Sequence, residues 1–161
     1  MERIKIKHLF LAFGILSLAL ACSENNDGTA DTEYPVIDAS FTESFPQQCS
    51  VVKRGKMLVF RARFTDNVAL GSFTVNVHNN FNHHSHTTEY GECADDPEEK
   101  TPVDPFTYNK SFDIPGAPRT YEAELEITIP DDVDPGDYHF EIRVVDQTGW
   151  QTLRGLSIKI Q

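Results

Sequence analysis

One stretch of the sequence decides the fold: Asp134-Pro135-Gly136-Asp137-Tyr138-His139-Phe140-Glu141-Ile142-Arg143-Val144. From Tyr138 onward, apolar and polar side chains alternate, as they do in an antiparallel strand with one buried face. The first five residues have the Asp-x-Gly-x-Tyr form of a tyrosine corner, which lies near the start of strand F in immunoglobulin-like folds. Phe140 stands where such folds can carry their second core cysteine. The stretch therefore predicts an all-β, immunoglobulin-like antiparallel β-sandwich in which Tyr138 begins strand F.

Other segments alternate in the same way and supply the remaining strands of a single domain at 34–161. The expected strands are A at 35–41, B at 57–65, C at 71–78, E at 120–129, F at 137–145 and G at 150–160. Residues 79–119 then form a long insertion between strands C and E, and this insertion contains five prolines. Because irregular segments of this length in compact domains usually carry function, we expect the insertion to contribute to a binding site.

The N-terminus has the features of an export signal at residues 1–21. Three cations precede Leu9–Leu20, an uncharged apolar run of twelve residues, which is shorter than the roughly 20 residues that span a bilayer. The run ends in Leu18-Ala19-Leu20-Ala21-Cys22, which resembles the lipobox of bacterial lipoproteins. The resemblance implies a lipid on Cys22, a polar tether at 22–33 and an outer-membrane protein facing the periplasm or the cell surface. The alternative is an ordinary secretory signal that leaves Cys22 as a plain thiol.

The charge and the other two cysteines narrow the choice of partners and compartment. The net charge is −11, and loss of residues 1–21 would remove a net charge of +2. A chain with this negative charge repels nucleic acid and anionic headgroups. We therefore expect no nucleic-acid partner, and membrane association only through the lipid anchor.

In an oxidising compartment, Cys49 and Cys93 form an even pair and are predicted to make a disulfide. The alternative is Cys93 as a metal ligand.

Histidines form the most distinctive cluster in the sequence. Four of the five that follow residue 21 lie in His78-Asn79-Asn80-Phe81-Asn82-His83-His84-Ser85-His86. In an extended chain His84 and His86 point the same way and His83 the opposite way. Because strands C and F are neighbours in this fold, the end of C should place His78 beside His139 at the start of F. Imidazole is a common ligand of zinc and copper, so these five histidines form a predicted transition-metal site.

Two further binding hypotheses remain open. The same surface could be a metal-independent glycan-binding or adhesion module that contacts a glycan or a surface protein, with Phe81 and Tyr90 as stacking residues. A less favoured site for calcium is formed by Asp66, Asn67 and Asp146 at the other end of the sandwich, where oxygen-rich turns meet. We do not expect an enzyme, because the sequence has no His-Glu-x-x-His or Gly-x-Ser-x-Gly motif; a metal-dependent hydrolase is the residual alternative.

Several segments together resemble an uncharacterised lipoprotein family of Gram-negative bacteria, a domain of unknown function. The resembling segments are Ser44 to Cys49, Phe64 to Asn67, His78 to His86, Gly136 to Phe140 and Gly149 to Leu153. The pattern His-Asn-Asn-Phe-x-His-His-x-His is the most specific of them. The resemblance implies an immunoglobulin-like fold and an exported, lipid-anchored protein, and it implies no particular activity.

Overall fold

The computed structural model describes residues 30–38, 40–85, 87–89 and 93–161. Its strands lie in one compact unit, Asp31–Gln161. The signal peptide predicted at 1–21, the lipidation site Cys22 and the tether up to residue 29 lie outside the described residues. In the part of the chain that is described, no helix is long and apolar enough to cross a membrane.

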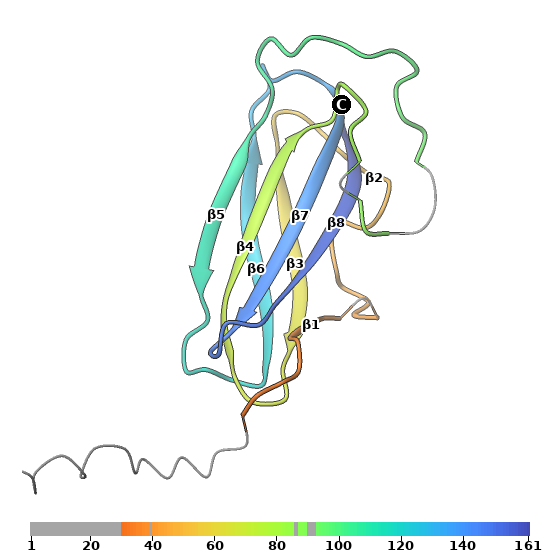
Figure 1. Ribbon diagram of the computed structural model, residues 1–161. Helices are drawn as coiled ribbons and strands as arrows, with labels where there is room; N and C mark the ends of the chain where they lie inside the picture. The colour runs from red at the N-terminus through yellow and green to blue at the C-terminus, as the bar shows by residue number, and fades with distance from the viewer. Residues whose placement is uncertain (1–29, 39, 86, 90–92) are drawn as a thin grey trace, which may run out of the picture. The chain divides into compact units, whose positions relative to one another are not determined.

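The domain is a sandwich of two β-sheets, which confirms the predicted fold class (Figure 1). The smaller sheet has the order β1 (Val36–Ile37), β3 (Lys56–Thr65) and β6 (Thr120–Ile129). The larger sheet has the order β2 (Ser50–Val52), β8 (Gln151–Ile160), β7 (Gly136–Asp146), β4 (Leu70–Asn79) and β5 (Tyr108–Asp113). β2 runs parallel to β8, and the other paired strands are antiparallel. Strands β4 and β7, predicted as C and F, are neighbours as expected.

The core lies between the sheets and is built from the apolar half of each alternating strand. Phe60 and Phe64 of β3 face Phe73 of β4 and Phe140 of β7, and all four rings are buried. The centroids of Phe60 and Phe140 are 5.7 Å apart, and those of Phe64 and Phe73 are 5.2 Å apart. These separations suit offset or tilted aromatic packing, which adds to the burial of apolar area. Phe140, at the position of a core cysteine in related folds, therefore takes part in an aromatic core.

The tyrosine corner is present. The hydroxyl of Tyr138 donates to the carbonyl oxygen of Asp134 at 2.6 Å and accepts from the backbone N–H of Phe106 at 3.1 Å. Tyr138 is 0% exposed, and burial raises the pKa of its phenol above the usual value. One side chain therefore ties the start of β7 both to the turn before it and to the end of the insertion.

Two short strands were not predicted from the sequence. β5 lies inside the segment 79–119, which was expected to be irregular, and it pairs with β4 at the edge of the larger sheet. Its residues are mostly exposed and polar, so it lacks the alternation that marks a half-buried strand. β2 has three residues and follows Cys49, whose φ of 64° places it in the left-handed region. Within its described residues, the segment 79–119 therefore contains one strand of its own, β5, with irregular chain before and after it.

A disulfide fastens the insertion to the sheet, as predicted. Cys49 and Cys93 are bonded with a Cα–Cα distance of 5.3 Å, so Cys93 cannot serve as a metal ligand. Close by, the ammonium group of Lys159 lies 2.9 Å from Asp96 and 3.2 Å from Asp137. The hydrogen bond to Asp96 is the main reason that the pKa of Lys159 is raised. The acidic part of the insertion is therefore held against the edge formed by β2 and β8.

Candidate functional site

Three histidine rings converge at one end of the larger sheet. His78 of β4 is directly paired with His139 of β7, and their ring centroids are 5.4 Å apart. His84, from the segment after β4, lies 5.5 Å from His78 and 5.0 Å from His139 by the same measure. The neighbouring positions of His78 and His139 follow from the predicted pairing of these strands.

The chain after β4 turns back over the outer face of the larger sheet, and this turn brings His84 to the other two rings. The backbone N–H of Asn80 donates to the carbonyl of Asp137, and that of His83 donates to the carbonyl of Asn80. The hydrogen bond from His83 to Asn80 closes a turn, and the φ of 53° places His83 in the left-handed region. The returning segment covers His139, which is 1% exposed although it stands on the polar face of β7.

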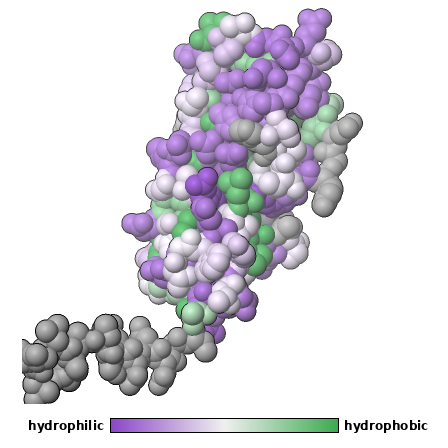
Figure 2. Space-filling view, in the orientation of Figure 1, coloured by the Kyte–Doolittle hydropathy of each residue, from purple (hydrophilic) through white to green (hydrophobic). Residues whose placement is uncertain are grey.

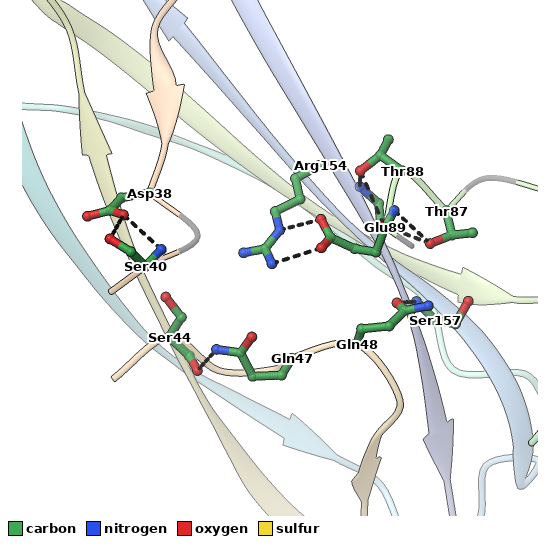
Figure 3. A network of polar contacts seen from close by, with 11 residues as sticks. Asp38, Ser40, Ser44, Gln47, Gln48, Thr87, Thr88, Glu89, Arg154 and Ser157 are labelled. Atoms are coloured by element: carbon green, nitrogen blue, oxygen red, sulfur yellow. Dashed lines mark hydrogen bonds and ion pairs between the residues drawn. The ribbon is translucent and has the colours of Figure 1, made fainter. Parts of the chain in front are cut away.

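A polar network on β8 holds the returning segment in place (Figure 3). The carboxylate of Glu89 receives two hydrogen bonds from the guanidinium of Arg154, at 2.7 and 3.3 Å. The backbone N–H of Thr88 donates to the carbonyl of Gly155 at 2.9 Å, and the N–H of Gly155 donates to the Thr88 hydroxyl at 3.1 Å. Bidentate pairs of this kind fix orientation as well as distance. The position of His84 is therefore fixed by contacts on both sides of it in the chain.

Each of the three rings has one nitrogen in contact with an oxygen atom. Nδ1 of His78 contacts the amide oxygen of Asn76 at 2.7 Å, and Nδ1 of His84 contacts that of Asn82. Nε2 of His139 contacts the carbonyl oxygen of His84 at 2.9 Å. Because these oxygens only accept, each of these nitrogens donates. This is the arrangement that orients histidine ligands in metal sites.

The other members of the predicted cluster differ in position. His83 is exposed, and among the described residues no ring contact joins it to His78, His84 or His139. His86 lies outside the described residues, as does Tyr90. Phe81 is buried against Tyr138 at a centroid distance of 5.3 Å, so the interpretation of Phe81 as a ligand-stacking residue is wrong.

The acidic residues considered for calcium lie at the end of the β4–β7 pair that is far from His78 and His139. Asp66 follows β3 and Asp146 ends β7, and a carboxylate oxygen of each lies within 4.8 Å of one from Asp31. Asn67, the third residue predicted there, is exposed. Asp31 was missed because it lies in the polar stretch that the sequence predicted to be a tether.

Comparison with known proteins places the chain in a family without an assigned activity. No curated protein matches the sequence. The family model described as "Domain of unknown function (DUF4625)" matches residues 20–161, which include the whole sandwich, the histidine segment and the acidic residues at the other end. With most of its length matched, the chain belongs to this domain-of-unknown-function family.

Proposed function

We propose that this protein is an exported lipoprotein, anchored through Cys22, whose sandwich domain binds zinc or copper through His78, His84 and His139. The observation that carries the proposal is the mutual contact of the three rings, with centroids 5.0 to 5.5 Å apart. A zinc–nitrogen bond of about 2.1 Å places a ring centre about 3.2 Å from the metal, so tetrahedral ligands have ring centres about 5.2 Å apart. The observed spacing therefore suits three imidazoles around one ion.

The surroundings of the rings favour a metal-binding role. Each ring has one nitrogen hydrogen-bonded to an oxygen of Asn76, Asn82 or the His84 backbone, which supplies the second layer of contacts that tunes a metal ligand. Three protein ligands would leave a fourth position for water or for a group from a partner. Capture of a metal ion at the surface is the role that this geometry supports best.

The histidine cluster and the first residue of the compact unit lie at opposite ends of the domain. His78 and His139 are separated from Leu70 and Asp146 by about eight residues along paired strands, a distance of about 26 Å at 3.3 Å per residue. Asp31, where the compact unit begins, lies near Asp146. Hydrophilic side chains gather at the end of the sandwich where β4 ends (Figure 2). The histidines therefore lie at the end of the domain opposite Asp31.

Titration calorimetry on the full chain, purified in detergent, tests the metal site. We expect one equivalent of zinc or copper to bind with micromolar or tighter affinity, and this binding to be lost in His84→Ala. His83→Ala is the matched control, because His83 is adjacent but exposed, and it should keep the site. Absence of stoichiometric metal, or equal uptake by both variants, would overturn the proposal.

The anchor is tested separately. Cells fed labelled palmitate should label the wild-type chain, and Cys22→Ser should abolish the label while the domain still folds. A labelled Cys22→Ser variant, or an unlabelled wild type, would mean that the N-terminus is an ordinary secretory signal.

A polar groove supports a second candidate function, metal-independent binding of a glycan or a surface protein. The groove has a volume of about 180 Å³ and is lined by Thr74, Asn76, Asn109, Glu141, Arg143 and Leu153. Amide, carboxylate and guanidinium groups together suit hydroxyl-rich ligands, which need several hydrogen bonds of fixed direction. Saccharide-array binding that persists in chelator and in His84→Ala would favour this function over metal capture.

A further inference from the structure

Three carboxylates meet where three separate parts of the chain come together, at the end of the domain opposite the histidines. Asp31 comes from the segment that enters the domain, Asp66 from the turn between β3 and β4, and Asp146 from the end of β7. One carboxylate oxygen of each lies within 4.8 Å of those of the other two. Convergence of like charges from distant segments is unfavourable unless a cation lies between them.

Asp146 shows most clearly that turn formation does not explain this arrangement. Its Oδ1 accepts hydrogen bonds from the backbone N–H groups of Thr148, Gly149 and Trp150, at 2.6 to 2.9 Å. Its Oδ2 is buried with no hydrogen-bond partner, although the residue is only 4% exposed. Oδ1 therefore stabilises the β7–β8 turn, whereas Oδ2 makes no hydrogen bond within the fold.

In Asp31 and Asp66, too, one carboxylate oxygen accepts backbone hydrogen bonds and the other accepts none. Oδ2 of Asp66 accepts from the backbone N–H groups of Val68 and Ala69, and Oδ1 of Asp31 accepts from that of Glu33. The remaining oxygens, Oδ1 of Asp66 and Oδ2 of Asp31, are buried without a hydrogen-bond partner. Buried polar atoms are normally satisfied, so a carboxylate cluster in which each member keeps one buried oxygen without a hydrogen bond is suited to a cation.

We propose that Asp31, Asp66 and Asp146 bind a calcium ion, which fastens the segment entering the domain to the two turns at this end of the sandwich. Hard oxygen ligands exclude a soft metal and leave calcium or magnesium. Oxygens on opposite sides of calcium are about 4.6 to 5.2 Å apart, against about 4.0 to 4.2 Å for magnesium, whose octahedron is also stricter. Ligands from three separate segments suit the variable coordination of calcium.

Trp150 connects this site to the entering segment. Its indole N–H donates to the carbonyl oxygen of Asp31 at 3.0 Å, and its ring packs edge-on against Tyr34 at a centroid distance of 4.8 Å. Calcium would therefore order residues 31–34 against the domain. The inference is independent of the histidine cluster, which lies at the other end of β4 and β7.

Trp150 is the only tryptophan in the sequence, so terbium luminescence provides a site-specific test on the full chain in detergent. Terbium is a hard cation that takes oxygen ligands as calcium does, and excitation of Trp150 should sensitise its emission only if the ion lies nearby. We expect calcium to displace it. Asp31→Asn should weaken binding about tenfold or more through loss of one ligand charge, whereas Asp132→Asn, which removes an exposed acidic group elsewhere, should not.

Thermal unfolding supplies a second measurement that does not depend on luminescence. Calcium should raise the Tm of the wild type and of the His84→Ala variant, because a ligand of the folded state stabilises it. Asp31→Asn should fold but gain much less from calcium, since Asp31 lies at the edge of the domain. Absence of calcium-displaceable emission, or equal responses from Asp31→Asn and Asp132→Asn, would overturn the proposal whatever the histidines bind.

Discussion

Removal of the Tyr138 hydroxyl is expected to destabilise the domain measurably, although Tyr138→Phe leaves the aromatic packing almost unchanged. The change takes the acceptor from the N–H of Phe106 and the donor from the carbonyl of Asp134. A buried N–H that loses its partner costs about 1–3 kcal/mol, and a lost hydrogen bond about 0.5–1.5 kcal/mol. We therefore expect the free energy of unfolding to fall by about 2–3 kcal/mol.

Urea denaturation measures this loss. At a slope of about 2 kcal/mol per molar, the expected change lowers the midpoint by about 1 M with the slope unchanged. Tyr121→Phe, which removes a hydroxyl from a half-buried tyrosine, is the control and should shift the midpoint far less. A loss below about 0.5 kcal/mol for Tyr138→Phe would refute the claim that the hydroxyl ties β7 to the insertion.

The pH dependence provides a second check on the same residue. Burial raises the pKa of Tyr138 above the usual value of 10.0, so the unfolded chain loses this proton first as the solution becomes alkaline. The stabilising contribution is therefore complete below pH 10.0 and is lost as the pH rises through the folded-state pKa. Tyr138→Phe should remove this part of the alkaline loss, and an unchanged profile would contradict the assignment.

Three further predictions concern stability. Replacing Cys49 and Cys93 by serine opens a loop with a sequence separation of 44 and should cost about 4 kcal/mol by chain entropy; a reductant titration of the wild type should reproduce the loss in urea denaturation. Gly71→Ala would place a Cβ 2.8 Å from the carbonyl oxygen of Asp146 and should destabilise the domain by about 1–3 kcal/mol, visible as a lower Tm, whereas a neutral effect would contradict the close approach. The pKa of Lys159 is raised above 10.5, so the stability that its charged form contributes is complete below that pH and is lost as the pH rises through the folded-state pKa. Lys159→Met should therefore make the free energy of unfolding depend less on pH in alkaline solution, and an unchanged pH dependence would contradict this.

The long strands could be predicted from the sequence because their burial follows the alternation of their residues. β6, for example, has the predicted bounds Thr120–Ile129, since every second side chain points into the core. β2 and β5 could not be predicted, because an edge strand that buries little gives no such pattern. Their positions depend on pairing with β8 and β4, which is a property of the folded sheet.

In the candidate sites, too, some features follow from the strand pattern and others depend on how the whole chain folds. The approach of His78 to His139 could be predicted, because it needs only the neighbouring positions of two strands and their direction. The position of His84 and the burial of His139 depend on how the chain after β4 folds back, which no local pattern specifies. Asp31 carries no periodic signal either, and its position beside Asp66 and Asp146 depends on the packing of distant segments, including its hydrogen bond with Trp150.

The most direct test of the central proposal is anomalous diffraction at the zinc absorption edge from crystals of the full chain grown with one equivalent of zinc. The account predicts one strong peak among the rings of His78, His84 and His139, within about 2.1 Å of a nitrogen of each. No peak at that position, or zinc bound only at carboxylates elsewhere on the surface, would contradict it.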